Sequence, residues 1–236
     1  MRPYDPSTPA WISASTADSG IRTREFIRSV YGWMTVGLVL TALAAMWVIS
    51  SPFMQALVLR NPIVLIGLIV AELGIVIFLS VKQRTISPGA ASAAFLVYSF
   101  LNGLTLSVVA FVYTRSSITL AFGISAGMFG AMALYGLVTK RDLTSWGSFF
   151  MMGLFGVLIL MFAGIFIHAS ALQMTIATLG IFVFLGLTAY DNQKLKRLAE
   201  SGAGGGSLAV IGALVLYLDF INLFLFVLRL LGDRRR

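Results

Sequence analysis

Seven apolar runs, separated by short polar segments, follow one another along most of the chain. Each run is close to or above the roughly 20 apolar residues that an α-helix needs to cross the hydrocarbon core of a bilayer. The predicted spans cover residues 29–49, 61–81, 89–113, 117–138, 146–168, 170–190 and 207–231. Pro52, Pro62 and Pro88 fall at ends of spans, where a missing amide donor costs little. The pattern predicts an all-α membrane protein with seven transmembrane helices.

The first 28 residues differ from the rest of the chain. They begin "MRPYDPSTPAWISAS" and contain prolines, hydroxyl side chains and charges of both signs, but no apolar run. A secretory signal requires a hydrophobic stretch near the start, so we interpret residues 1–28 as a polar cytoplasmic arm. The first span then serves as the targeting signal. Because the later connecting segments are short, residues 29–236 are predicted to form one transmembrane domain.

Composition supports this class and removes several kinds of site. Hydrophobic residues make up 58% of the chain, charged residues only 11%, whereas soluble domains have about a quarter charged residues. Cysteine is absent, which excludes disulfides, thiolate metal sites and a cysteine nucleophile. The single histidine, His168, cannot assemble a zinc site with other imidazoles or thiols. We therefore expect no resident cofactor.

The basic residues indicate orientation. Although the formal net charge is +8, they are spread over short segments instead of forming one patch, so nucleic-acid binding is not expected. Cytoplasmic loops carry an excess of Lys and Arg. The opposite loops contain only Arg60 and Arg115. The arm and the loops on its side contain eleven: Arg2, Arg22, Arg24, Arg28, Lys82, Arg84, Lys140, Arg141, Lys194, Lys196 and Arg197. The N-terminus is predicted to be cytoplasmic.

The C-terminal end carries charges that oppose this rule. Seven spans place it outside, where Arg229 and the run Arg234–Arg236 would then lie. Either the earlier charges dominate, or the last segment enters the membrane and returns to the same side. We favour seven simple crossings.

Small residues recur in the fourth span. Gly123 and Gly127 form a GxxxG pair, which Gly130 continues. Small residues allow helix backbones to approach closely within a membrane. We interpret this stripe as an intramolecular packing face in preference to a dimer face.

Three of the nine acidic residues lie within or at the end of predicted spans: Glu72, Asp191 and Asp219. An ionised acid at the centre of a membrane helix costs about 2.5 to 3.5 kcal/mol on insertion scales, and such acids usually face a cavity or a partner. Asp219 is about twelve residues into the last span, on the order of 18 Å from its cytoplasmic end. Its side chain therefore cannot reach water along the helix.

Asp191 and Asp219 lie toward the same side of two spans that a single loop joins, so we expect them to be neighbours. Two carboxylates in a low dielectric do not both ionise cheaply, and such a pair holds a single proton. Carboxylate oxygens also suit Ca²⁺, so the pair is a candidate for weak, transient Ca²⁺ binding. Asp191 alone also has a simpler interpretation, as an acid at the water-exposed end of its helix.

The remaining intramembrane polar residues have structural interpretations as well. Glu72 lies midway along the second span, either lining an ion path or hydrogen-bonded as a protonated acid to a neighbouring helix. Asn102 and Asn222 are candidates for satisfying buried partners in the same manner. Tyr190 and Tyr217 precede the two aspartates by one or two residues and are candidate donors to them.

Four segments together resemble the transmembrane Bax inhibitor motif family, most closely its bacterial inner-membrane members: "VYGWMTVGLVLTALAA", "AGMFGAMALYGLVTKRDL", "GLTAYDNQKLK" and "LYLDFINLFLFVLRLLG". The resemblance implies that the last of seven helices is central and that the protein is a pH-governed cation leak, notably for calcium. It also implies that Asp191 and Asp219 are a hydrogen-bonded pH-sensing pair. A basic latch from the second span would be Lys82 or Arg84.

Two function classes follow. The first is a pH-sensitive Ca²⁺ leak channel of the bacterial inner membrane that responds to protons through the aspartate pair. The alternative, also implied by the resemblance, is a regulator that transports nothing and binds a membrane protease or another integral-membrane partner. The sixth and seventh spans are joined by a flexible glycine-rich segment, "AESGAGGGS", where a short turn would hold them more closely. We expect this segment to let the two acid-bearing helices move separately.

Enzyme chemistry is not expected. Intramembrane aspartyl proteases carry Tyr-Asp on one helix and Gly-x-Gly-Asp on the next. Tyr190 and Asp191 match the first element, but "LYLD" at Asp219 lacks both glycines. A retinal pigment needs a lysine inside a helix. The four lysines all lie in or beside predicted loops: Lys82, Lys140, Lys194 and Lys196.

Overall fold

The computed structural model describes residues 10–167, 169–233 and 235. Residues 1–9 of the predicted arm and His168 lie outside the described residues. Helices are the regular elements in the described part of the chain: α1 Ala10–Ser50, α2 Pro52–Leu59, α3 Pro62–Lys82, α4 Pro88–Leu106, α5 Val109–Val112, α6 Arg115–Val138, α7 Thr144–Phe166, α8 Ser170–Glu200 and α9 Gly206–Leu231.

Seven helical segments of the described chain are long and apolar enough to cross a membrane, which confirms the predicted fold class. Two helices are longer than predicted. α1 begins at Ala10, so residues 10–28 of the predicted arm are helical. α8 continues ten residues past the predicted end at 190, because "NQKLKRLAE" consists largely of good helix formers and buries Leu195 and Ala199.

Proline and a capping side chain together start three of the helices. Pro52, Pro62 and Pro88 stand in the first helical turn, where their missing amide donor has no intrahelical partner to lose. The residue before each one, Ser51, Asn61 or Ser87, accepts hydrogen bonds from amides of the first turn. The short polar segments of the sequence therefore fix where these helices begin.

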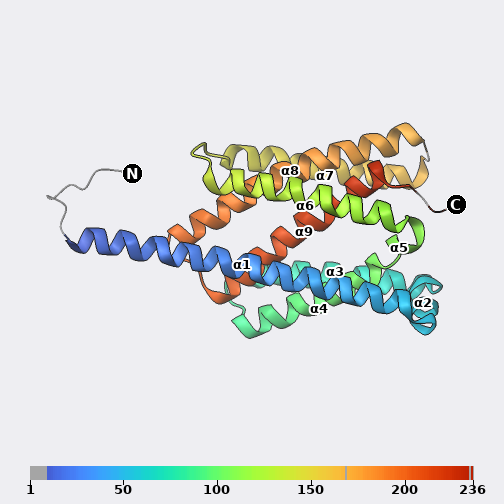
Figure 1. Ribbon diagram of the computed structural model, residues 1–236, viewed down its shortest axis with the longest axis horizontal. Helices are drawn as coiled ribbons and strands as arrows, with labels where there is room; N and C mark the ends of the chain where they lie inside the picture. The colour runs from blue at the N-terminus through green and yellow to red at the C-terminus, as the bar shows by residue number, and fades with distance from the viewer. Residues whose placement is uncertain (1–9, 168, 234, 236) are drawn as a thin grey trace.

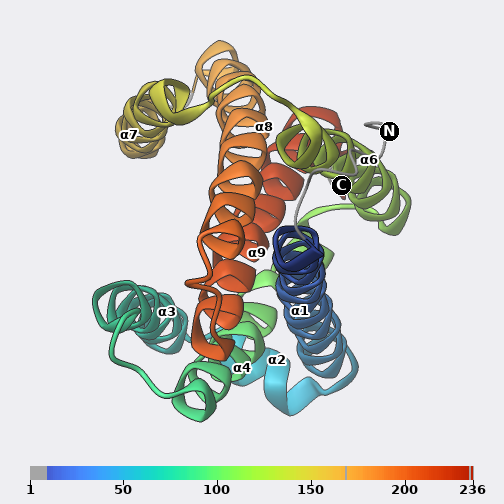
Figure 2. The same cartoon turned by 90° about the vertical axis from the view of Figure 1, so that its left-hand side faces the viewer.

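α9 is the central helix. It packs against α8, α1, α6 and α4, while α3 packs on α4, and α7 on α8 (Figures 1 and 2). In its most apolar 18-residue window, 78% of the residues of α9 are buried, against 6% for α3 and for α7. A side chain on α9 therefore faces protein in most directions, whereas α3 and α7 expose most of their surface to lipid.

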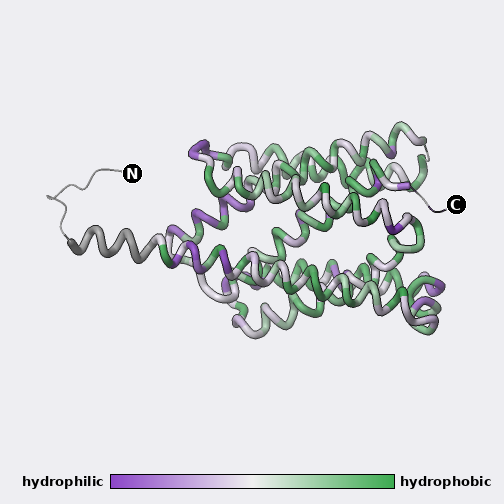
Figure 3. Tube along the Cα trace, in the orientation of Figure 1, coloured by the Kyte–Doolittle hydropathy of each residue, from purple (hydrophilic) through white to green (hydrophobic). Residues whose placement is uncertain are grey.

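Polar residues gather at the two ends of the bundle, with an apolar zone between them (Figure 3). One end, the N-terminal face, carries the start of α1 and the loops that follow α3, α6 and α8 (Figure 1). The opposite end, the C-terminal face, carries α2, α5 and the end of α9. α9 crosses between them without a break, so the last span does not return to its starting side.

The end of the chain is attached to the C-terminal face. The amide of Thr114 donates to the carbonyl of Asp233, 3.1 Å away, and the amide of Arg235 donates to the carbonyl of Val112, 2.9 Å away. The amide of Asp233 also donates to the side chain of Ser117. These bonds hold the end of α9 to the segment that joins α5 and α6.

The prediction that Gly123 and Gly127 pack inside the molecule is wrong. A Cβ atom at either position, or at Gly130, would meet nothing within 4 Å. α6 instead buries a different stripe: Ala121, Ser125, Phe129, Ala133 and Gly136. The close helix contacts occur at other glycines, since a Cβ at Gly136 would overlap the backbone of Ala189 in α8.

This difference predicts unequal effects of the same substitution on α6. Gly136→Ala should lower the free energy of unfolding by about 1–3 kcal/mol, because it forces α6 away from α8. Gly123→Ala, the matched control, should be neutral or stabilising by up to about 1 kcal/mol, since alanine favours helix and the site is open. Thermal unfolding of the purified proteins in detergent measures both. Equal unfolding midpoints would contradict the close α6–α8 contact.

Candidate functional site

Asp219 is buried at the centre of the molecule. It lies midway along α9 with 4% of its surface exposed, and its Oδ2 atom has no hydrogen-bond partner among the described residues. The flanking residues Tyr217 and Phe220 are also buried. Burying a charged carboxylate without a partner is costly, so Asp219 differs from the acids that only hold membrane helices together.

Asp191 lies on α8, the helix that packs most extensively against α9. Asp191 lies near enough to Asp219 for their charges to interact, and Lys194, one turn further along α8, is a cation close to Asp191. Within the described residues no hydrogen bond joins the two carboxyl groups. Asp191 does not end its helix, because α8 continues to Glu200.

The latch candidates lie at the end of a helix that does not pack against α8 or α9. Lys82 and Arg84 are exposed at the end of α3, a helix that packs on α4 and α2. No ion pair between described residues connects either one to Asp191 or Asp219. Among the described residues, neither carboxyl group therefore forms an ion pair with a basic side chain.

The polar residues that follow Asp191 fix α8 to its neighbours. The hydroxyl group of Tyr31 on α1 donates to Oδ1 of Asn192, and Nδ2 of Asn192 donates to the carbonyl of Thr188. Gln193 accepts from the amide of Leu143 and donates to the carbonyl of Arg141. Sequence reasoning missed Asn192 and Gln193, although both belong to the same "YDNQK" motif as Asp191.

An exposed acid strengthens the same attachment at the N-terminal face. Asp142, in the loop before α7, accepts hydrogen bonds from Thr144 and from Arg197 of α8. The Thr144 side chain and amide, together with the Arg197 guanidinium, lower the pKa of Asp142 to about 2. Since this pKa lies well below neutrality, Asp142 stays ionised from pH 6 to 8 and does not contribute to a pH response there.

Glu72 belongs to a second polar cluster, which joins four helices. Its carboxylate accepts hydrogen bonds from Asn102 Nδ2 at 3.0 Å and Thr105 Oγ1 at 2.9 Å, both on α4. Asn102 Oδ1 in turn accepts from the hydroxyl group of Tyr217 on α9, at 2.9 Å. That hydroxyl lies 2.6 Å from Thr41 Oγ1 on α1. Unlike Asp219, Glu72 has a hydrogen-bond partner on each of its two carboxylate oxygens.

The other predicted partners lie elsewhere. Tyr217 donates to Asn102 and not to Asp219. Asn222 donates to the carbonyl of Leu218 in its own helix. A Cβ at Gly147 of α7 would overlap the ring of Tyr190, so this tyrosine packs on α7. Neither tyrosine is a donor to the aspartate pair in this structure.

The described residues around the pair offer few ligands for a metal ion. Among the described residues, no group of three or more Asp, Glu, His or Cys side chains is placed to hold a metal ion. Ca²⁺ prefers six to eight oxygen ligands. Asp191 and Asp219 could supply only part of such a shell, so an ion there would need carbonyl groups or water as well.

The Glu72 cluster predicts that one hydroxyl group contributes to stability. Tyr217→Phe should lower the free energy of unfolding by about 1–2 kcal/mol, because Asn102 loses its buried donor. Tyr98→Phe is the matched control, because the ring of Tyr98 also packs on Tyr217. The hydroxyl group of Tyr98 makes no hydrogen bond with the described residues, so this substitution should lower the free energy of unfolding by less than about 0.5 kcal/mol. Thermal unfolding measures both, and equal losses would contradict the network.

Comparison with known proteins agrees with these observations. The sequence profile described as "Inhibitor of apoptosis-promoting Bax1" matches residues 23–236. The "Inner membrane protein YbhL" of Escherichia coli K12 is 45% identical over 222 residues, which cover 92% of this chain and 94% of that protein. A protein of Borreliella burgdorferi is 40% identical over 215 residues, covering 89% and 93% of the two chains.

A protein of Caulobacter vibrioides matches almost end to end. It is 34% identical over an alignment of 247 positions, which covers 99% of this chain and 98% of that protein. Together with the seven apolar helices, the similarity to an inner membrane protein supports a multi-pass protein of a bacterial inner membrane. The extent of these matches shows that the chain belongs to the Bax inhibitor family of membrane proteins.

Proposed function

We propose that this protein is a pH-sensitive cation leak channel, with Ca²⁺ among its permeant ions, and that Asp191 and Asp219 form its gate. One observation carries the proposal: an acid on the central helix is buried with an unpartnered oxygen, beside a second acid. Structural acids in membranes are normally paired or hydrogen-bonded. Glu72, with its two donors, follows that rule, and Asp219 does not.

The pH response follows from electrostatics. With one proton on either acid, the pair carries a single negative charge, which the packed α8–α9 contact tolerates. Loss of that proton places two like charges close together in a low dielectric, where their repulsion is screened poorly. The repulsion is relieved when α8 and α9 separate or when a cation enters. Cation passage should therefore increase as the pH rises.

The loop at the N-terminal face is compatible with separation of α8 and α9. The loop between α8 and α9 contains Gly202, whose φ of 76° suits glycine, followed by Gly204 and Gly205. At the other end, backbone hydrogen bonds hold Asp233 to the α5–α6 segment. We expect α9 to pivot about its C-terminal end, with the larger displacement at the N-terminal face.

The proposal predicts that one carboxyl group sets the pH dependence. In liposomes that contain a calcium dye, Ca²⁺ influx through the native protein should rise about tenfold from pH 6 to 8, equivalent to a gating change of about 1.4 kcal/mol. Asp219→Asn keeps the shape of the side chain but removes its charge, so influx should vary little with pH. Glu25→Gln, a change at an exposed acid of α1, should respond like the native protein.

Two results would oppose the proposal in different ways. If Asp219→Asn keeps the native pH dependence, the pair is not the sensor. If neither protein passes Ca²⁺, Na⁺ or protons at any pH, the alternative gains support: a regulator that transports nothing and binds a membrane protease or another integral-membrane partner.

A further inference from the structure

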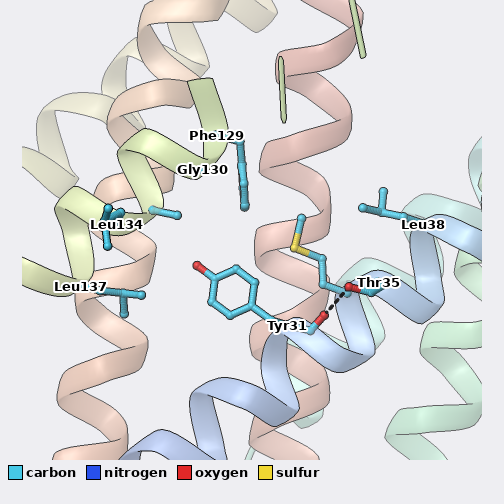
Figure 4. A pocket seen from close by; sticks show the side chains of 9 residues that line it. Tyr31, Thr35, Leu38, Phe129, Gly130, Leu134 and Leu137 are labelled. Carbon is cyan, nitrogen blue, oxygen red and sulfur yellow. Dashed lines mark hydrogen bonds between the residues drawn. The ribbon is translucent and has the colours of Figure 1, made fainter. Parts of the chain in front are cut away.

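An apolar groove separates α1 from α6. The two helices both pack on α8 and α9 but make little direct contact with each other. The groove has a volume of about 380 Å³, and its α1 wall includes Tyr31, Met34 and Leu38 (Figure 4). Its α6 wall consists of Phe129, Gly130, Ala133, Leu134 and Leu137. Its lining is almost entirely hydrocarbon, apart from the hydroxyl groups of Tyr31 and Thr35.

A second, basic pocket continues this groove toward the N-terminal face. It has a volume of about 360 Å³ and shares Leu137 with the groove. Three cationic side chains line it: Arg24 and Arg28 from α1, and Lys196 from α8. On α1, both pockets use one stripe of the helix, because residues 24, 28, 31, 35 and 38 follow one another at intervals of three or four.

The cations of this pocket are only partly neutralised. Lys196 donates to the carbonyl of Leu137 and lies 4.0 Å from Glu200. Arg24 and Arg28 are exposed, and within the described residues neither one forms an ion pair. The lining of this pocket is mostly hydrocarbon, so Arg24 and Arg28 contribute their aliphatic stems to it, and their guanidinium groups stay exposed one turn apart on α1. Two guanidinium groups so placed match a phosphate group beside the pocket, because arginine binds phosphate through paired N–H donors.

The dimensions match half a bilayer. From Arg28 to Leu38 is ten residues of helix, or about 15 Å, and half of the hydrocarbon core is about 15 Å thick. A molecule with its phosphate group at Arg24 and Arg28 would therefore place a chain along Tyr31, toward Leu38. Since α1 and α6 are membrane spans, lipid is the molecule that surrounds this groove at the highest concentration.

We propose that the α1–α6 groove binds an anionic phospholipid of the leaflet at the N-terminal face. Arg24, Arg28 and Lys196 bind the headgroup, and the groove between Tyr31 and Gly130 holds an acyl chain. Basic pockets between membrane helices bind such headgroups by the same combination of charge and shape. The proposal concerns a lipid site and does not depend on whether the protein conducts ions.

Native mass spectrometry of the purified full-length protein tests the headgroup part, with phosphatidylglycerol or phosphatidylcholine added in equal amounts. The native protein should bind phosphatidylglycerol preferentially. The double substitution R24Q/R28Q should weaken that binding by about tenfold or more, because each lost cation weakens attraction to the anionic headgroup. Lys140→Gln, which removes one exposed charge from the same face outside the pocket, should change it less than about twofold.

A second pair of variants tests the acyl-chain part and separates a lipid from a small phosphate. Gly130→Leu fills the groove, while Gly123→Leu adds the same side chain to open α6 surface, where a Cβ meets nothing within 4 Å. Gly130→Leu should weaken phosphatidylglycerol binding, whereas Gly123→Leu should not. Inorganic phosphate should not displace phosphatidylglycerol from the native protein. Unfolding midpoints identify any variant that has lost its fold.

Three outcomes would overturn the proposal. The first is equal retention of the two lipids by the native protein. The second is unchanged phosphatidylglycerol binding in R24Q/R28Q. The third is equal binding by Gly130→Leu and Gly123→Leu, which would place the lipid outside the groove.

Discussion

The fold depends on one constraint: a polar group inside a membrane protein must be satisfied by the protein, because lipid offers no hydrogen bonds. α9 meets this constraint by lying at the centre, with α1, α4, α6 and α8 around it. Its polar side chains therefore face other helices. The peripheral helices α3 and α7 are almost uniformly apolar by comparison, and the side chain of Glu72 on α3 is bonded to α4.

The two polar centres of the molecule meet the constraint to different degrees. Around Glu72, both carboxylate oxygens have a hydrogen-bond partner, and the chain of contacts through Asn102, Tyr217 and Thr41 joins α3, α4, α9 and α1. Such a closed network favours a single arrangement. Around Asp219, the carboxyl group has an unpartnered oxygen and an acidic neighbour, so its balance depends on a proton or a cation. The Glu72 network holds the helices together, and in our proposal the site at Asp219 allows α8 and α9 to change their packing.

Much of this architecture could be predicted from the sequence, because membrane length and hydropathy constrain helices strongly. The seven spans and the helix starts at Pro62 and Pro88 follow from local pattern. The packing face of α6 does not, since a GxxxG stripe indicates only that close approach is possible, and the helix turned its other face inward. The partner of Tyr217 could not be predicted either. Asp219 is near it in sequence, but the fold brings Thr41 of α1 and Asn102 of α4 to its hydroxyl group.

The most direct test of the central claim is the protonation state of the aspartate pair, measured by infrared spectroscopy of the reconstituted protein between pH 6 and 8. The account predicts a protonated carboxyl band that weakens as the pH rises, is absent in Asp219→Asn, and is unchanged in Asp142→Asn. If the native protein shows no such band in this range, or if the band persists in both Asp191→Asn and Asp219→Asn, the pair does not share a proton and the account of the gate is wrong.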